Sequence, residues 1–202
     1  LWWIKFKMEY FEKILENALF LLIVINPVSK ILIINSLIGE GKQFIKNISV
    51  KSSYTGLIIL IIFAVGGNFI LRNIFRINIY SLQIAGGIIL FLFGLNALLK
   101  GGFGIDETKD KEEIAMITLA SMIAGPGTIT ATISLSAVYG VISVCISIIL
   151  AVFINFILMI YSIEIGKLLG KNLLGPLVRL TGFFISSIGM NMAFTGIKEF
   201  LK

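Results

Sequence analysis

Long apolar stretches, separated by short polar ones, run along almost the whole chain. They cover residues 11–38, 54–71, 79–99, 114–135, 141–163 and 173–200. Each is close to or longer than the roughly 20 residues that cross about 30 Å of hydrocarbon as a helix. Because backbone polar groups in lipid must find partners within their own segment, these stretches are expected to be helices. The pattern therefore predicts an all-α membrane protein with six transmembrane helices and the lipid bilayer as its surroundings.

Composition supports this fold class and narrows the list of functions. Hydrophobic residues make up 57% of the 202 residues and charged residues 14%, and the mean hydropathy is +1.01. Average soluble domains carry about 25% charged residues. The net charge of +6 is spread over short polar stretches and forms no basic stripe with aromatics, so no nucleic-acid partner is expected. Cys145 stands alone and can form no internal disulfide.

Positive charges between the apolar stretches predict an orientation. The loops after the first, third and fifth stretches hold nine Lys and Arg, against seven on the other side, which includes both termini. This small excess places both termini outside the cytoplasmic membrane. The first apolar stretch continues through Asn26-Pro27 without a small-residue cleavage site, so we expect a retained first helix rather than a signal peptide.

The two halves of the chain resemble each other. Residues 64–71 (AVGGNFIL) and 151–158 (AVFINFIL) are identical at six of eight positions, including Asn68 and Asn155. Repeat one is expected over 11–99 and repeat two over 114–200, with a polar linker at 100–113. Because each repeat has an odd number of spans, the second must enter the membrane in the opposite sense, as in the inverted repeats of many secondary transporters.

Both repeats have a proline in the middle of their first helix. Pro27 follows Asn26, and Pro126 lies between Gly125 and Gly127. Proline removes an amide donor and clashes with the preceding turn, so helices one and four are expected to be broken near the middle of the membrane. Breaks in corresponding positions of two halves indicate a transporter's substrate site.

Small polar residues follow each break. Ser29 and Lys30 follow the first, and Thr128 and Thr130 follow the second. Together with the residues of the breaks, they are the candidate substrate-binding residues: Asn26, Pro27, Ser29, Lys30, Gly125, Pro126, Gly127, Thr128 and Thr130. Two interpretations of Lys30 stay open, a partner for a substrate carboxylate and a side chain that reaches for the membrane surface.

Other unusual residues favour packing over binding. Asn68 and Asn155 are expected to hydrogen-bond between helices, and Gly86, Gly87 and Gly182 to let helices approach closely. The chain has no His, and its Asp residues lie in the central linker. No catalytic pair, metal site or cofactor site is therefore expected, and the chain is not predicted to be an enzyme.

Several of these stretches resemble the MarC family of integral membrane proteins. Asn26-Pro27 is similar to that family's first-helix motif, and residues 123–130 (IAGPGTIT) resemble its most characteristic motif. Residues 82–101 and 179–201 are similar to its third and sixth helices. The resemblance implies a six-span protein of the cytoplasmic membrane that is distantly akin to LysE-type exporters. Some members of the MarC family are regarded as transporters of small neutral amino acids. Asn96 stands where an acidic residue is common, and prolines common near both breaks are missing.

The sequence thus predicts a secondary transporter of small neutral amino acids or similar small polar solutes. A proton or sodium ion stays open as the coupling ion, and so does a homo-oligomer. The alternatives are a non-transporting membrane scaffold or stress-response partner, and a channel. Matched breaks distinguish a transporter from a scaffold, which does not need them.

Overall fold

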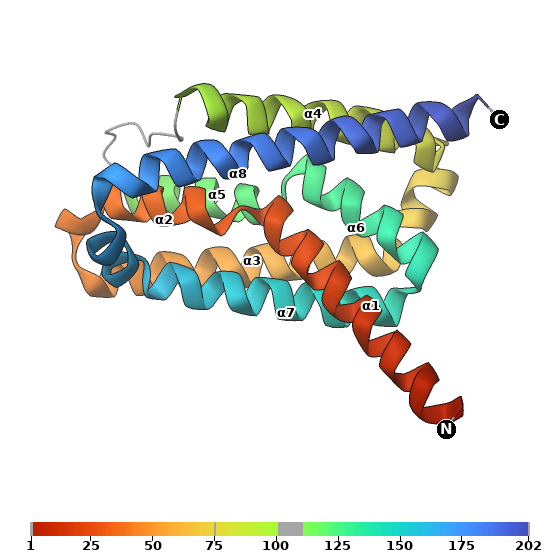
Figure 1. The fold of residues 1–202 in the computed structure, drawn as a ribbon, viewed down its shortest axis with the longest axis horizontal. Helices are drawn as coiled ribbons and strands as arrows, with labels where there is room; N and C mark the ends of the chain where they lie inside the picture. Colours follow the sequence, from red (N-terminus) through yellow and green to blue (C-terminus); the bar gives the residue numbers. More distant parts are fainter. Residues whose placement is uncertain (1, 75, 101–110, 202) are drawn as a thin grey trace.

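The computed structural model describes residues 2–74, 76–100 and 111–201, which form a bundle of helices with no strand in these ranges (Figure 1). The α-helices are α1 (Trp2–Ile25), α2 (Pro27–Ser36), α3 (Lys42–Phe69), α4 (Ile79–Lys100), α5 (Lys111–Ile123), α6 (Pro126–Tyr139), α7 (Val141–Ile160) and α8 (Ser162–Phe200). A 3₁₀ turn spans Ile38–Glu40 and a π-helical turn Ile70–Ile74. Residues 101–110, most of the expected linker, lie outside the described residues.

Six helical segments are long and apolar enough to cross a membrane, which confirms the predicted number and class. They are Met8–Ser36, Lys42–Ile74, Ile79–Leu99, Glu112–Tyr139, Val141–Ile160 and Asn172–Phe200. The first combines α1 with α2, and the fourth combines α5 with α6. Lys42–Ile74 and Glu112–Tyr139 are clearly longer than their apolar stretches, because polar residues continue the same helical turns.

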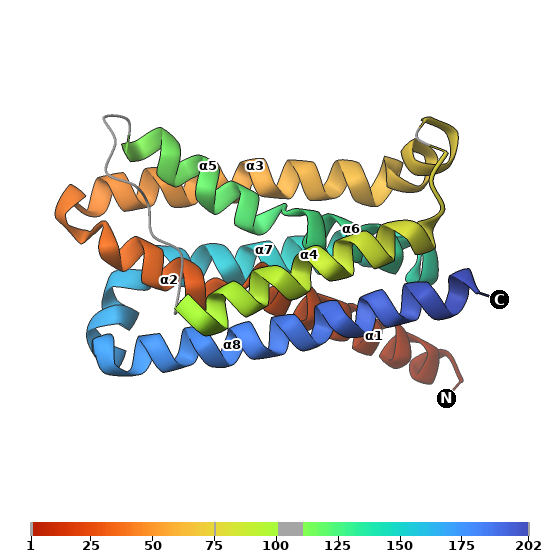
Figure 2. The same cartoon turned by 90° about the horizontal axis from the view of Figure 1, so that it is seen from above.

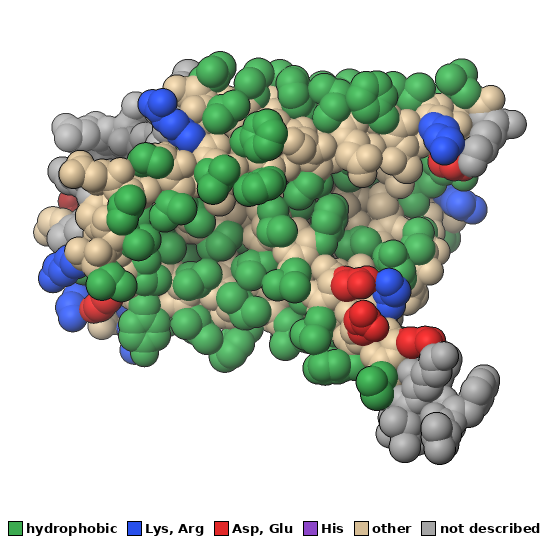
Figure 3. Space-filling model, in the orientation of Figure 1, with side chains coloured by type: hydrophobic (Ala, Val, Ile, Leu, Met, Phe, Trp, Pro, Cys, Tyr) green, Lys and Arg blue, Asp and Glu red, His purple; other side chains and the backbone are tan. Residues whose placement is uncertain are grey.

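The surface has the distribution of side chains that a bilayer requires. Hydrophobic side chains cover the middle of the face in Figure 3, and charged side chains gather at its two ends. The ion pairs Lys13–Glu16, Lys42–Glu164 and Lys51–Glu112 join exposed side chains. Both termini lie at one end of the bundle (Figure 1), as an even number of spans demands.

The region before the last span differs from the expected loop. Helix α8 begins at Ser162, soon after α7 ends at Ile160, and bends at Gly170, whose φ of 66° and ψ of 165° are not helical. Glycine adopts such a left-handed φ without steric cost, so a short helix can precede the span. The fifth span thus ends at Ile160 rather than at residue 163, which corrects the sequence expectation, whereas the sixth span, Asn172–Phe200, begins within one residue of the expected position.

Contacts between the halves come in exchangeable pairs. Helix α1 packs on α7 as α5 packs on α3, and α2 packs on α8 as α6 packs on α4. Helix α3 also contacts α7, and α4 contacts α8 more extensively than any other pair (Figure 2). Exchanging α1–α4 with α5–α8 therefore reproduces these pairs, so the two halves pack against each other in a similar way.

Glycines bring α4 and α8 together along their length. A Cβ atom on Gly94 would lie 2.4 Å from the Ser186 nitrogen, and one on Gly189 would lie 2.4 Å from the Phe91 nitrogen. Later residues of α4 meet earlier residues of α8, so the two helices are antiparallel. This close backbone approach, typical of small residues in membrane helices, fixes one wall of the cavity described below.

Candidate functional site

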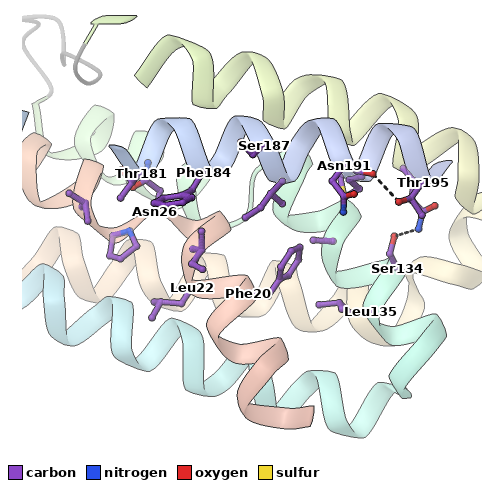
Figure 4. A pocket seen from close by; sticks show the side chains of 17 residues that line it. Phe20, Leu22, Asn26, Ser134, Leu135, Thr181, Phe184, Ser187, Asn191 and Thr195 are labelled. Atoms are coloured by element: carbon purple, nitrogen blue, oxygen red, sulfur yellow. Dashed lines mark hydrogen bonds between the residues drawn. The ribbon is translucent and has the colours of Figure 1, made fainter. Parts of the chain in front are cut away.

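A cavity of about 720 Å³ lies between the first helix break and the last helix (Figure 4). Both halves of the chain contribute to its wall. The lining residues are Phe20, Leu22, Ile23, Asn26, Pro27, Val28, Gln83, Ala131, Ser134, Leu135, Thr181, Phe184, Ser187, Ile188, Asn191, Met192 and Thr195. They come from α1, the break, α2, α4, α6 and α8. Phe184, Ser187, Asn191 and Thr195 on α8 are exposed, so the cavity is an open groove that forms where the two halves pack together.

One face of α8 forms the longest wall. Its lining residues recur every three or four positions from Thr181 to Thr195, which corresponds to about 21 Å at 1.5 Å per residue. In Figure 4 the apolar side chains Phe20, Leu22 and Phe184 lie between two polar ends, with Ser187 also in this middle part and Leu135 near the second end. Among the described residues that line the cavity, none carries a charge. The walls therefore suit a solute without net charge.

The two polar ends are built differently. Asn26 and Thr181 lie at one end, next to the break, and Ser134, Asn191 and Thr195 lie at the other (Figure 4). At the second end Gln83 Nε2 donates a hydrogen bond to Ser134 Oγ at 3.2 Å. This bond ties α4 of the first half to α6 of the second across the cavity.

Asn26 makes the first break possible. Its φ of 56° and ψ of 70° are left-handed, a conformation that asparagine tolerates better than most residues. Its Oδ1 accepts a hydrogen bond from Ser29 N at 3.3 Å, and its Nδ2 donates one to Ser29 Oγ at 2.6 Å. Asn26 thus ends α1 and caps α2, with Pro27 in the first helical position, where its missing amide costs nothing.

Lys30 completes the polar closure of this break. Its side chain is fully buried, and its Nζ donates a hydrogen bond to the carbonyl of Ile25, the last residue of α1. Ser29 is also fully buried. Neither residue lines the cavity. Lys30 pairs with the carbonyl that the interruption of the helix leaves free, and Ser29 pairs with the Asn26 side chain.

The second break has no such side-chain closure. Gly125 precedes α6 in an extended conformation and supplies no capping side chain. Pro126 is exposed, whereas Gly127, Thr128 and Thr130 are buried. None of these five residues lines the cavity.

Close packing replaces capping at this second break. Thr130 Oγ1 donates to the Pro126 carbonyl at 2.8 Å. A Cβ on Gly127 would lie 2.7 Å from Leu90 Cδ1, and one on Gly86 would lie 2.2 Å from Thr130 Oγ1. The breaks thus occupy corresponding places in the chain, but only Asn26 and Pro27 of the candidate residues reach the cavity.

The matched asparagines have different surroundings. Asn155 is fully buried, and its Nδ2 donates to Met159 Sδ at 3.2 Å. Asn68 is half-buried, and the Oδ1 atoms of both residues lack a hydrogen-bond partner among the described residues. The expected bonds between helices therefore stay predictions. Gly87 and Gly182 lie at the α4–α8 contact, and Gly86 instead faces α6.

Most of the cavity wall was not among the candidate residues. Thr181, Ser187, Asn191 and Thr195 follow helical spacing along α8, so the sequence does place them on one face. It gives no sign that this face meets a cavity, because other membrane helices use such faces for packing. Among the described residues, no group of three or more potential His, Cys, Asp or Glu ligands lies together.

Comparison with known proteins supplies the wider context. A family profile described as "MarC family integral membrane protein" matches residues 11–201. A UPF0056 membrane protein of Pyrococcus horikoshii, PH0214, is 37% identical over 92% of this chain and 93% of its own length. No solved structure matches the chain.

Bacterial relatives match over similar lengths. A UPF0056 membrane protein of Aquifex aeolicus is 30% identical over 96% of this chain and 97% of its own length. The UPF0056 membrane protein YvbG of Bacillus subtilis is 31% identical over 93% and 95%, respectively. The likeness therefore covers all six spans and both helix breaks.

Proposed function

The chain belongs to the MarC family of integral membrane proteins, and we propose that it is a secondary transporter of small neutral solutes. The observation that carries the proposal is the groove-like cavity that both halves line beside the first helix break. In transporters built from inverted repeats, the substrate lies at such an interface, next to interrupted helices. Rocking of one half against the other then opens the site to each side in turn.

The lining indicates what kind of solute fits. Amide and hydroxyl groups at the two ends can hydrogen-bond a polar group, and the aromatic and aliphatic middle can accept an apolar one. A neutral solute with one polar end, such as a small neutral amino acid, meets both requirements. The volume of about 720 Å³ leaves room for larger members of this class and for water.

The remaining functional assignments are part of the same proposal. The protein resides in the cytoplasmic membrane with both termini outside, and a proton or a sodium ion is the candidate coupling ion. Assembly into a homo-oligomer is compatible with transport, because a single chain supplies all of the residues that line the cavity.

Flux measurements with purified protein in liposomes test the proposal. Uptake and efflux of labelled neutral amino acids, from glycine and serine to leucine, are compared with empty liposomes. The Ser187→Trp variant should lose at least about tenfold of the flux, because the indole fills the middle of the cavity. The matched control is Ile62→Trp, which puts the same ring on an exposed position in the apolar middle of α3.

The outcomes separate transport from the alternatives. Flux that saturates with solute concentration and is blocked only by Ser187→Trp supports the carrier. Flux without saturation and without selectivity would indicate a channel instead. No flux for any solute of the panel, from protein that is folded and correctly inserted, would contradict the proposal and favour the scaffold.

A further inference from the structure

Lys30 is the one charged side chain that is buried among the residues that the structure describes. Its exposed fraction is 0%, and it takes no part in the three ion pairs found in this part of the chain. Those pairs lie at the ends of the bundle, whereas Lys30 lies within the first membrane span. A charge at this depth is costly and indicates a specific task.

The geometry around Lys30 shows what its ammonium group does. In an unbroken helix Ser29 N would donate to the Ile25 carbonyl four residues earlier, but here it donates to Asn26 Oδ1 instead. The Ile25 carbonyl is thereby left at the end of α1, where the helix dipole concentrates negative charge. Lys30 Nζ donates to this same carbonyl.

Carbonyl groups at the ends of broken helices are the usual ligands for coupling cations in transporters. At the first break, the amino group of Lys30 already occupies that position. We propose that the Lys30 ammonium is a tethered cation that takes the place of a bound sodium ion at the carbonyl end of α1. In the transporter proposed above, on which this second step rests, transport then runs without a sodium gradient.

The second break provides an internal contrast. Aligned on the two prolines, Lys30 corresponds to Ile129, an apolar residue. The two repeats therefore share the broken helix but not the cation. The charge is a property of the first break alone, which is also the break that reaches the cavity.

Thermal unfolding in detergent tests the tethered cation without any transport assay. The wild type should melt at the same temperature in sodium, potassium and choline chloride of equal ionic strength. Lys30→Met, which keeps most of the volume but removes the charge, should melt at least about 4 °C lower, because the Ile25 carbonyl loses its partner. Lys30→Gly leaves a space beside the Ile25 carbonyl that a sodium or ethylammonium ion can enter. Sodium or ethylammonium chloride should therefore raise the melting temperature of this variant relative to choline chloride.

The exposed Lys13 gives matched controls. Lys13→Met and Lys13→Gly alter an exposed lysine of α1 that pairs with Glu16, and neither should respond to the choice of cation. Sodium-dependent stability of the wild type would overturn the proposal, and this holds even where a Lys30 variant fails to fold. Equal melting of wild type and Lys30→Met, or a folded Lys30→Gly variant indifferent to cations, would overturn it as well.

Transport in liposomes tests the second step separately. Wild-type flux should be the same with and without a sodium gradient. Flux that needs the gradient would contradict the sodium-free mechanism while leaving the transporter itself intact. Absence of all flux would instead contradict the proposed function, while the melting experiments would still decide whether Lys30 acts as a cation.

Discussion

At the first helix break the chain satisfies its polar groups with side chains, whereas at the second the backbone packs against a neighbouring helix. Asn26 and Lys30 bond to the groups that the first interruption releases. At the second, Gly125 offers no cap, and Gly127 lies against Leu90 of α4. The same interruption, present in both halves of the chain, is therefore stabilised in two different ways, and only the first break contributes residues to the cavity wall.

The two breaks are therefore stabilised by different interactions. Side-chain hydrogen bonds hold the first break in a defined shape next to the cavity, where a solute would contact it. Steric packing holds the second break, so its shape depends on α4 staying in place. Substitutions at the two breaks should therefore destabilise the protein for different reasons, and by different amounts of unfolding free energy.

The largest effect is expected at Asn26. Asn26→Leu combines a left-handed backbone that leucine resists with the loss of the cap on α2, so the free energy of unfolding should fall by about 3 kcal/mol. Asn26→Gly tolerates the backbone and loses only the cap, and should cost about 1 kcal/mol. Melting temperatures in detergent measure both variants. Equal losses would show that the left-handed conformation is not a requirement.

A smaller loss is expected where α4 meets the second break. Gly86→Ala puts a methyl group against the Thr130 side chain, 2.2 Å from its Oγ1, and should cost about 2 kcal/mol by overpacking. Gly66→Ala is the control, because its new Cβ would meet only Ile70 Cδ1 at 3.6 Å. Since alanine is the better helix former, that control should gain about 0.5 kcal/mol. A stable Gly86→Ala variant would argue against steric closure of the second break.

The smallest effects come from single hydroxyl groups, and they should still differ between the breaks. Ser29→Ala leaves the buried amide of Asn26 without its acceptor and should cost about 1 kcal/mol. Thr130→Val removes only an additional bond to the Pro126 carbonyl, so about 0.5 kcal/mol is expected. Chemical unfolding of both variants measures the difference. A costlier Thr130→Val would reverse the contrast between side-chain and steric closure.

Much of the fold could be predicted from the sequence because lipid leaves few choices. Apolar stretches of membrane-spanning length had to be helices, and Pro27 and Pro126, each in the middle of such a stretch, were expected to interrupt them. The short helix before Gly170 was not predicted, since its residues are polar enough for a loop and only the packed chain shows it as helical.

The cavity was less predictable than the fold. The sequence pointed to both breaks, because proline and glycine act locally on the backbone. Whether a break faces a cavity depends on the neighbouring helix, and Leu90 covers Gly127 while Thr181 and Phe184 leave room beside Asn26. Such relations between distant segments leave no local pattern, so the wall formed by α8 became visible only in the structure.

The central claim is that the cavity beside the first break opens to both sides of the membrane. A single cysteine at Thr181, in a chain whose only other cysteine is removed by Cys145→Ala, measures this directly. The account predicts that a membrane-impermeant thiol reagent labels this cysteine in both right-side-out and inverted vesicles. A control cysteine at Ile62, which is exposed in the apolar middle of α3, should react in neither. Labelling of the Thr181→Cys variant from one side only, or from neither side, would contradict the account.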